Sequence, residues 1–171
     1  EDDTHISEGF YEGSGMHGEY PVTVDHWLRE AEWDDKRRFE QLKALIVNSL
    51  ILDFGSGAGG FLKRAQKLAT RAIGVELESR VKNHWGNDLE IVSSIDEAYQ
   101  LSEGKHDLIT AFHVLEHLKD PRETLKELGK LLSNDGHMIV EVPNADDALL
   151  TLFDCKSFQS FTYWSQHLFL F

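Results

Sequence analysis

The pattern of apolar and polar positions predicts strands and helices in alternation after the first quarter of the chain. Short apolar runs bounded by glycine, proline or charged residues are typical of buried strands, and apolar residues three or four positions apart are typical of helices. Strands are predicted at residues 49–53, 72–76, 90–93, 107–112 and 137–142. Helices, the first in one or two pieces, are predicted at residues 25–47, 59–68, 79–85, 95–99 and from Asp120 onward. Residues 133–136 are predicted to form a turn before the last strand.

This alternation predicts an α/β fold, a Rossmann-like open parallel sheet with helices on both faces, because parallel strands need crossover connections. Residues 25–171 are expected to form that domain. Residues 1–24 interleave glycines with aromatic residues, which fits an N-terminal arm or lid, or a loosely packed terminus. The chain begins without methionine and stops inside an apolar run, so we expect a fragment of a longer protein, truncated at its C-terminus.

Composition limits the classes of partner. The net charge of −13 disfavours a surface that binds the phosphates of nucleic acid, which needs clustered lysine and arginine. No apolar run approaches the roughly 20 residues of a membrane-spanning helix. The single cysteine, Cys155, is typical of a protein in a reducing cytoplasm. We therefore expect a cytoplasmic protein with a small-molecule substrate, and the sequence leaves the oligomeric state open.

A glycine-rich loop directly follows the first predicted strand, in the stretch Asp53-Phe54-Gly55-Ser56-Gly57-Ala58-Gly59-Gly60. Its glycines satisfy both the dinucleotide pattern, Gly-x-Gly-x-x-Gly, and the pattern of methyl-donor sites, Asp-x-Gly-x-Gly-x-Gly. A carboxylate at Asp53 would repel the pyrophosphate of a dinucleotide. The same carboxylate could hold the ammonium group of S-adenosylmethionine, which carries no phosphate. Asp53 therefore favours the methyl donor.

Glu76 ends the second predicted strand. A carboxylate at this place can accept hydrogen bonds from both hydroxyls of a ribose. NAD sites and methyl-donor sites share this acid, so Glu76 supports a nucleoside without separating the two cofactors. The alternative is a solvated acid at the end of a strand.

The ordered motifs resemble a class I S-adenosylmethionine-dependent methyltransferase of the small-molecule type. The matching segments are residues 52–59, 74–76, 112–121 and 136–144, and residues 164–168 resemble the segment that follows in the family. The resemblance implies a sheet that ends in an antiparallel strand pair, which this chain stops before. It also implies a cofactor site at Asp53, Gly55, Ser56, Gly57, Gly59, Glu76, Ser94, Ile95, Phe112 and His113.

Methyl transfer from a sulfonium is an in-line displacement, so alignment of the two reactants and exclusion of water supply much of the catalysis. A base is needed where the acceptor must lose a proton, and His113 and His117 are the candidates, with His17 and His167 as weaker ones. Alternatively, His117 only belongs to a helical turn. We expect no metal ion, although His113-x-x-Glu116-His117 resembles the Glu-x-x-Glu-His metal ligands of certain quinone-biosynthesis and small-RNA-end methyltransferases.

The sequence therefore predicts a methyltransferase that transfers a methyl group from S-adenosyl-L-methionine to a small-molecule acceptor and releases S-adenosyl-L-homocysteine. Two other functions stay open. The first is an NAD-dependent oxidoreductase, against which Asp53 argues. The second is a domain that binds S-adenosylmethionine without catalysis. The acceptor itself cannot be identified from the sequence.

Overall fold

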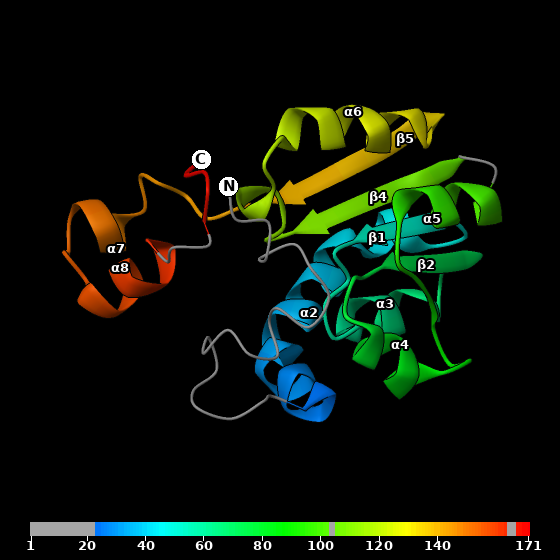
Figure 1. The fold of residues 1–171 in the computed structure, drawn as a ribbon, viewed down its shortest axis with the longest axis horizontal. Helices are drawn as coiled ribbons and strands as arrows, with labels where there is room; N and C mark the ends of the chain where they lie inside the picture. The colour runs from blue at the N-terminus through cyan, green and yellow to red at the C-terminus, as the bar shows by residue number, and fades with distance from the viewer. Residues whose placement is uncertain (1–22, 103–104, 164–166) are drawn as a thin grey trace.

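A computed structural model describes residues 23–102, 105–163 and 167–171, and it shows a five-stranded parallel sheet (Figure 1). The strand order is β3-β2-β1-β4-β5. Strands β2 and β3 are therefore added on one side of β1, and β4 and β5 on the other. This order creates a switch point between β1 and β4, at which ligands of open α/β sheets bind. The strands are β1 (Leu50–Phe54), β2 (Arg71–Val75), β3 (Glu90–Val92), β4 (His106–Phe112) and β5 (Leu132–Glu141).

Helices cover both faces of the sheet, as the alternating pattern predicts. One apolar cluster joins three helices to one face, and a second cluster joins two helices to the other. The helices of the first face are α2 (Val24–Ile46), α3 (Gly60–Ala65) and α4 (Ser79–Trp85), and those of the second are α5 (Ile95–Ser102) and α6 (Pro121–Lys130).

Strand β1 shows why the sheet is apolar on both faces. Ile51 belongs to the cluster beneath α2 and α3, whereas the next residue, Leu52, belongs to the cluster beneath α5 and α6. Successive side chains of a strand point to opposite faces, so a strand covered on both sides needs a continuous apolar run. By the same alternation, Asp53 points to the α2 side of the sheet.

The ends of two helices follow their capping residues. The Thr23 side chain accepts a hydrogen bond from the His26 backbone N–H at the start of α2, which is one continuous helix. The Asp120 side chain accepts from the Glu123 N–H, and Pro121 occupies the first turn of α6. Ser, Thr and Asp at this position satisfy backbone donors that a helix start leaves unpaired.

The turn predicted before the last strand lies instead inside β5. His106 pairs with Leu132 and Leu108 pairs with His137, so residues 133–136 bulge opposite the single residue Asp107. The prediction of a strand that starts at His137 was wrong because local turn residues indicate a chain reversal, whereas pairing with β4 continues on both sides of the bulge.

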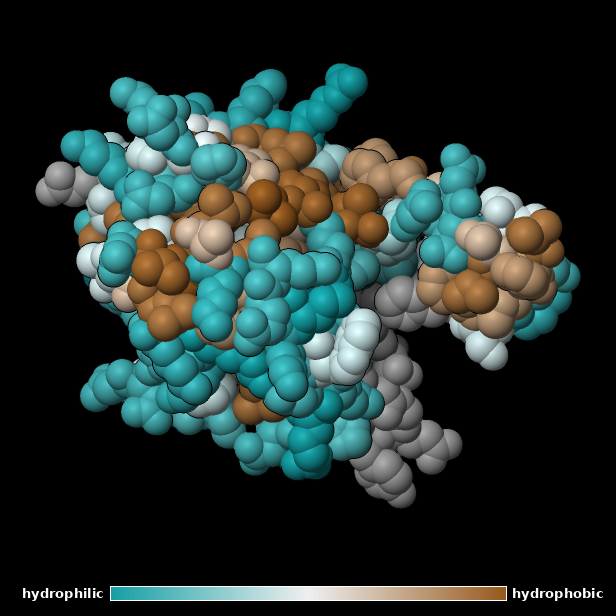
Figure 2. All heavy atoms as spheres, turned by 180° about the vertical axis from the view of Figure 1, so that it is seen from behind, coloured by the Kyte–Doolittle hydropathy of each residue, from teal (hydrophilic) through white to brown (hydrophobic). Residues whose placement is uncertain are grey.

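After β5 the chain forms two short helices, α7 (Ala148–Thr151) and α8 (Lys156–Thr162), which stand apart from the sheet (Figure 1). Apolar side chains gather on this lobe, at the right of Figure 2, where Leu152 and Phe153 are largely exposed. In the described residues beyond β5, no strand follows. None of the helices described here has the length and apolar character needed to cross a membrane.

Candidate active site

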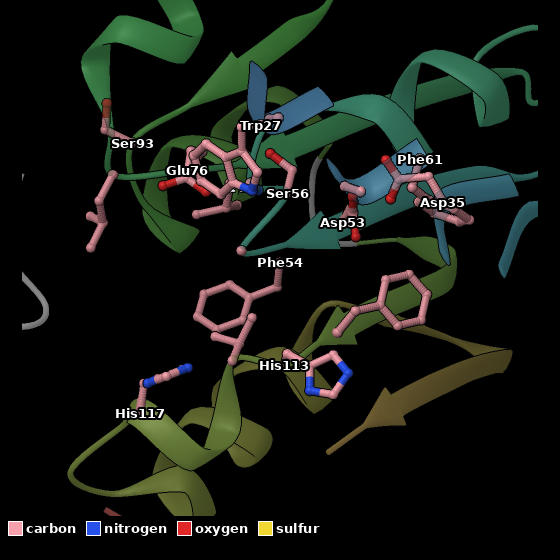
Figure 3. A pocket seen from close by; sticks show the side chains of 18 of the residues that line it. Trp27, Asp35, Asp53, Phe54, Ser56, Phe61, Glu76, Ser93, His113 and His117 are labelled. Atoms are coloured by element: carbon pink, nitrogen blue, oxygen red, sulfur yellow. Dashed lines mark hydrogen bonds between the residues drawn. The ribbon is translucent and has the colours of Figure 1, made fainter. Parts of the chain in front are cut away.

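A pocket of about 470 Å³ lies beyond the carboxyl ends of β1 to β4. The helix α2, the glycine loop after β1 and the loops after β2, β3 and β4 supply its walls. Figure 3 shows Asp53, Ser56 and Glu76 on one side of the pocket, and His113 and His117 on the opposite side. The switch point of the sheet therefore opens into one cavity that receives side chains from distant parts of the sequence.

The glycine loop takes a backbone course that few residues other than glycine adopt. Gly55 and Gly59 have φ values of +70° and +85°, in the left-handed region. The N–H groups of Gly55 and Ser56 both donate to the Val75 carbonyl, at 2.9 and 3.0 Å, which ties the loop to the end of β2. A Cβ at Gly55 would collide with the Val114 side chain. The loop is thus held between β2 and the segment after β4.

Asp53 is a buried acid at the wall of the pocket, with 2% of its surface exposed. Its Oδ1 accepts a hydrogen bond from Thr110 Oγ1 at 2.7 Å. Burial raises the pKa of Asp53 to about 7, and the bond from Thr110 only partly offsets that shift. A carboxyl group with this pKa gains strongly from a cationic ligand, because the ligand stabilises the charged form that burial disfavours.

Glu76 lies just beyond β2, and its carboxylate is oriented by two backbone donors. Gly57 N–H donates to Oε2 at 2.8 Å and Glu78 N–H donates to Oε1 at 3.1 Å. Burial nevertheless raises the pKa of Glu76 above its usual value. Each carboxylate oxygen accepts up to two hydrogen bonds, so the carboxylate keeps acceptor capacity that a diol can use. The glycine loop thus fixes the acid that we expect at a ribose.

His113 directly follows β4, and both of its ring nitrogens lie close to carboxylates. Nδ1 is 3.2 Å from Glu116 Oε1, and Nε2 is 3.1 Å from Glu141 Oε1. Burial by itself lowers the pKa of His113, but the hydrogen bonds to these two acids outweigh it and raise the pKa to about 9. His113 also has a φ of +54°, which is uncommon for a residue other than glycine. The ring is therefore held as a cation that donates from both nitrogens.

The role of His113 as a general base stays a prediction, and this geometry argues against it. A base needs a free lone pair on an uncharged ring, and both nitrogens here carry protons toward carboxylates. Glu141, at the end of β5, also accepts hydrogen bonds from Arg37 and Arg38 of α2. Burial raises the pKa of Glu141, but the bonds from His113, Arg38 and Arg37 outweigh it and hold that pKa well below its usual range. His113 thus belongs to an ion-pair network that joins α2 to the end of the sheet.

His117 lines the pocket on the same side and is mostly buried. It ends a short 3₁₀ helix, η2 (Leu115–His117), and its ring meets the His167 ring edge-on with centroids 4.9 Å apart. His167 is not among the pocket-lining residues. His17, the fourth histidine considered, lies outside the described residues, as do residues 1–22 of the arm expected at residues 1–24. The last two residues of that range instead belong to the start of α2, where Thr23 is the cap and Val24 the first helical residue.

Most of the cofactor residues expected from the sequence line this pocket. Phe112 meets the Phe61 ring edge-on at 5.1 Å, and its own ring lies 4.7 Å from the Arg38 guanidinium. Gly59 is an exception, because it is not among the lining residues. It precedes α3, and a Cβ there would lie 2.7 Å from Trp85 Nε1. Of the expected residues, those on the wall are Asp53, Gly55, Ser56, Gly57, Glu76, Ser94, Ile95, Phe112 and His113.

The sequence analysis did not predict the contribution of α2 to the site. Trp27, Asp35 and Arg38 all line the pocket, and Asp35 is buried. Burial raises the pKa of Asp35 to about 6, although Arg38 and Arg64 act in the opposite direction. Trp27, Ala31, Asp35 and Arg38 are spaced four, four and three residues apart, which places them on one helical face. The acidic residue Asp35 and the basic residue Arg38 share a helical face with apolar residues. That pattern was the sequence signal that could have identified α2 as a wall of the pocket.

Comparison with known proteins agrees with this geometry. A family described as a methyltransferase domain matches residues 24–171. None of the curated proteins matches the chain.

Solved structures share the fold at low sequence identity. A SAM-dependent methyltransferase from Archaeoglobus fulgidus is 22% identical with a TM-score of 0.57, and the match covers 75% of this chain and 64% of that one. The YcgJ protein from Bacillus subtilis is 20% identical with a TM-score of 0.53, covering 77% and 62%. An O-methyltransferase family protein from Burkholderia thailandensis is 13% identical with a TM-score of 0.61, covering 81% and 46%.

The chain thus spans less than two thirds of the length of each of these three structures. At these identities the likeness concerns the fold, while the family match extends over nearly all of the described residues. The chain therefore belongs to this methyltransferase domain family, and its fold is that of the class I S-adenosylmethionine-dependent methyltransferases.

Proposed function

We propose that the protein transfers a methyl group from S-adenosylmethionine to a small-molecule acceptor by in-line displacement. One observation carries this proposal. Two carboxylates face one pocket, with the glycine loop between them. Asp53 lies near the end of β1, and Glu76 directly follows the neighbouring strand β2. This arrangement suits a ligand that has a cationic amine at one point and a ribose diol at another.

The proposed cofactor extends across the ends of the first four strands. Its ammonium group lies toward Asp53, and its ribose hydroxyls bind the oxygens of Glu76 that Gly57 and Glu78 orient. Its adenine lies toward Ser94 and Ile95, which follow β3, and its sulfonium toward Phe112. An aromatic face stabilises a neighbouring cation, which fits the place given to the sulfonium.

An NAD-dependent oxidoreductase fits the pocket less well. The glycine loop would have to hold a pyrophosphate, which carries about two negative charges, beside the buried acid Asp53. Asp35 adds a second acid to the same wall. The arginines on the wall are already engaged, because Arg38 pairs with Glu141 and Arg80 pairs with Glu78. The local charge thus favours a cationic ligand over an anionic one.

A small-molecule acceptor fits the volume and the charge. Pockets for small molecules and cofactors measure roughly 300–1,000 Å³, and this one measures about 470 Å³. We place the acceptor on the side of Phe112 and His117, where a nucleophile could approach the methyl carbon opposite the sulfur. The net charge of −13 disfavours a nucleic-acid acceptor. The free thiol of Cys155 supports a reducing, cytoplasmic location.

Calorimetric titration with S-adenosylmethionine, S-adenosylhomocysteine and NAD tests the cofactor. We expect the first two to bind and NAD to show no measurable binding. Glu76→Gln should weaken S-adenosylmethionine about 10- to 100-fold, since hydrogen bonds to a charged group contribute about 1.5–3 kcal/mol. Glu90→Gln is the matched control, because Glu90 pairs with Arg71 away from the pocket. Preferential binding of NAD would contradict the proposal.

An activity assay distinguishes the proposed enzyme from a domain that binds the cofactor without catalysis. We expect the wild-type protein to methylate at least one compound in a panel of hydroxyl, amine, thiol and carboxylate acceptors, with stoichiometric release of S-adenosylhomocysteine. Binding of the cofactor with no methylated product across that panel would favour the non-catalytic function.

A further inference from the structure

Three metal-ligating side chains meet beside the pocket. Glu116, His117 and His167 each offer a ligand atom, and these atoms all lie within 4.8 Å of one another. Glu116 is fully buried, His117 is 9% exposed, and His167 is partly buried. Two imidazoles and one carboxylate at this spacing are a common ligand set of divalent transition metals.

Backbone contacts bring His167 to Glu116 and His117, although 50 positions of sequence separate His117 from His167. The N–H of Leu168 donates to the Glu116 carbonyl at 2.7 Å, and the N–H of Phe169 donates to the same oxygen at 3.3 Å. The C-terminal segment is therefore docked on η2 through the residues directly after His167. The edge-on contact between the His117 and His167 rings is part of the same arrangement.

The hydrogen bonds of His167 and Glu116 are compatible with an ion in the cluster. His167 Nδ1 lies 2.8 Å from the Thr162 carbonyl, so that nitrogen donates and Nε2 is the ring atom that would bind an ion. Histidines that bind metals usually donate their other ring nitrogen to a carbonyl or carboxylate in this way. Glu116 Oε1 accepts from His113 Nδ1, whereas Oε2 is buried without a hydrogen-bond partner among the described residues. An unsatisfied buried carboxylate oxygen is costly, and a cation removes that cost.

We propose that Glu116, His117 and His167 bind a divalent transition-metal ion such as Zn²⁺. Borderline metals of this kind accept imidazole nitrogen and carboxylate oxygen together. Three protein ligands also leave at least one coordination position for water or substrate, as in catalytic rather than structural zinc sites. The ligand set differs from the one considered on sequence grounds, because His113 orients the Glu116 carboxylate and His167 takes the place of a ligand.

The position of the site gives the ion a role, which rests on the proposed function. His117 lines the pocket, so an ion bound to its ring lies at the wall on the acceptor side. The open position would hold a hydroxyl oxygen of the acceptor and lower its pKa. That hydroxyl loses its proton to solvent, its oxygen forms the new bond to the methyl carbon, and the electron pair of the carbon–sulfur bond returns to sulfur. No histidine base is then required, and the acceptor class is a hydroxyl compound.

Metal titration of the chelator-treated protein tests the site without any activity assay. We expect one Zn²⁺ per chain by calorimetry and an increase in melting temperature on binding. Glu116→Gln and His167→Gln should each weaken Zn²⁺ binding by at least about tenfold. His26→Gln is the matched control, because His26 forms an exposed pair with Glu30 and should leave the affinity unchanged. Circular dichroism verifies that each variant is folded, and His167→Gln alone decides if Glu116→Gln does not fold.

Absence of stoichiometric binding by the wild-type protein would overturn the proposal, as would equal affinity in the wild type and in folded His167→Gln. The catalytic role is measured separately, with S-adenosylmethionine binding as the reference. We expect chelation to lower the turnover of a hydroxyl acceptor at least tenfold while cofactor affinity stays unchanged. If the untreated wild-type protein does not bind S-adenosylmethionine, that result counts against the proposed function and not against the metal site. Full turnover after chelation would show that the ion takes no part in the reaction.

Discussion

At the scale of single residues, the site depends on acids whose surroundings differ sharply. Asp53 is buried with one neutral donor, Thr110, so its pKa rises to about 7. Glu141 is surrounded by Arg37, Arg38 and His113, and these cations hold its pKa far below the usual range. The Asp53 carboxyl group is therefore suited to bind a cationic ligand, whereas the Glu141 carboxylate already contacts three cationic side chains.

Asp53→Asn should separate ligand binding from stability. We expect S-adenosylmethionine affinity to fall at least tenfold at pH 8, because the amide cannot pair with the ammonium group. In the wild type, affinity should weaken as the pH falls from 8 to 6, since protonation of Asp53 removes the charge. Calorimetry across this range measures both effects, and an Asp53→Asn affinity equal to that of wild type would contradict the placement of the cofactor.

His113→Ala should destabilise the fold by about 2–3 kcal/mol, because Glu116 then loses its donor while buried. His113→Asn should lose less, since asparagine tolerates the left-handed backbone and retains a donor. Urea unfolding measures both variants, with His137→Ala on the exposed side of β5 as the control. Equal stability of the alanine and asparagine variants would show that neither the donor nor the backbone conformation matters.

At the scale of elements, the glycine loop, α2 and the segment after β4 interlock. Gly55 packs against Val114, and Gly57 lies under the Trp27 ring, where a Cβ would be 3.0 Å from it. Arg38 of α2 reaches both Phe112 and Glu141. The loop therefore has its shape because elements from both halves of the sheet press on it.

Gly55→Ala should disrupt this arrangement. The new Cβ would collide with Val114, and the φ of +70° is unfavourable for alanine, so we expect a loss of several kcal/mol in stability and of cofactor binding. Gly129→Ala, in α6 with no atom within 4 Å of the new Cβ, should stabilise by about 0.5–1 kcal/mol. Thermal unfolding of the two variants compares them, and a neutral Gly55→Ala would mean that the loop adapts.

At the scale of the whole molecule, several buried groups oppose one another as the pH changes. The raised pKa values of Asp35 and Asp53 mean that the native state binds more protons than the unfolded state between about pH 4 and 7, so stability falls as the pH rises through that window. Burial lowers the pKa of His106 to about 4, which acts in the opposite direction between about pH 4 and 6.5. His106 therefore offsets only part of the pH dependence that the two aspartates produce.

Comparison with Asp53→Asn isolates one of these groups. In the absence of cofactor, the variant should gain stability over the wild type as the pH rises from about 4 to 7, and the difference should level off above that. The increase in melting temperature caused by S-adenosylmethionine should be larger at pH 8 than at pH 6 in the wild type, because binding then finds Asp53 ionised. A stability difference independent of pH would contradict the raised pKa.

The order of elements and the two pocket acids could be predicted because they depend on local patterns. Apolar runs, the helix start at Asp120, and acids at strand ends are fixed by neighbours in the chain. The bulge at residues 133–136 could not, since only pairing with β4 keeps both sides of it in one strand. Likewise, the sequence alone proposed His113 as a base, whereas its ionic partner Glu141 comes from a different strand.

The sequence by itself therefore determined the fold class, the family and the place of the glycine loop with Asp53 and Glu76, because short-range periodicity and spacing encode them. The tertiary structure decided which groups share a solvent-excluded space. It placed Asp35 and Arg38 in the wall and engaged both nitrogens of His113. It also brought His167 to Glu116 and His117. Protonation and ligand binding depend on such contacts between distant residues, since burial and charge act through space and not along the chain.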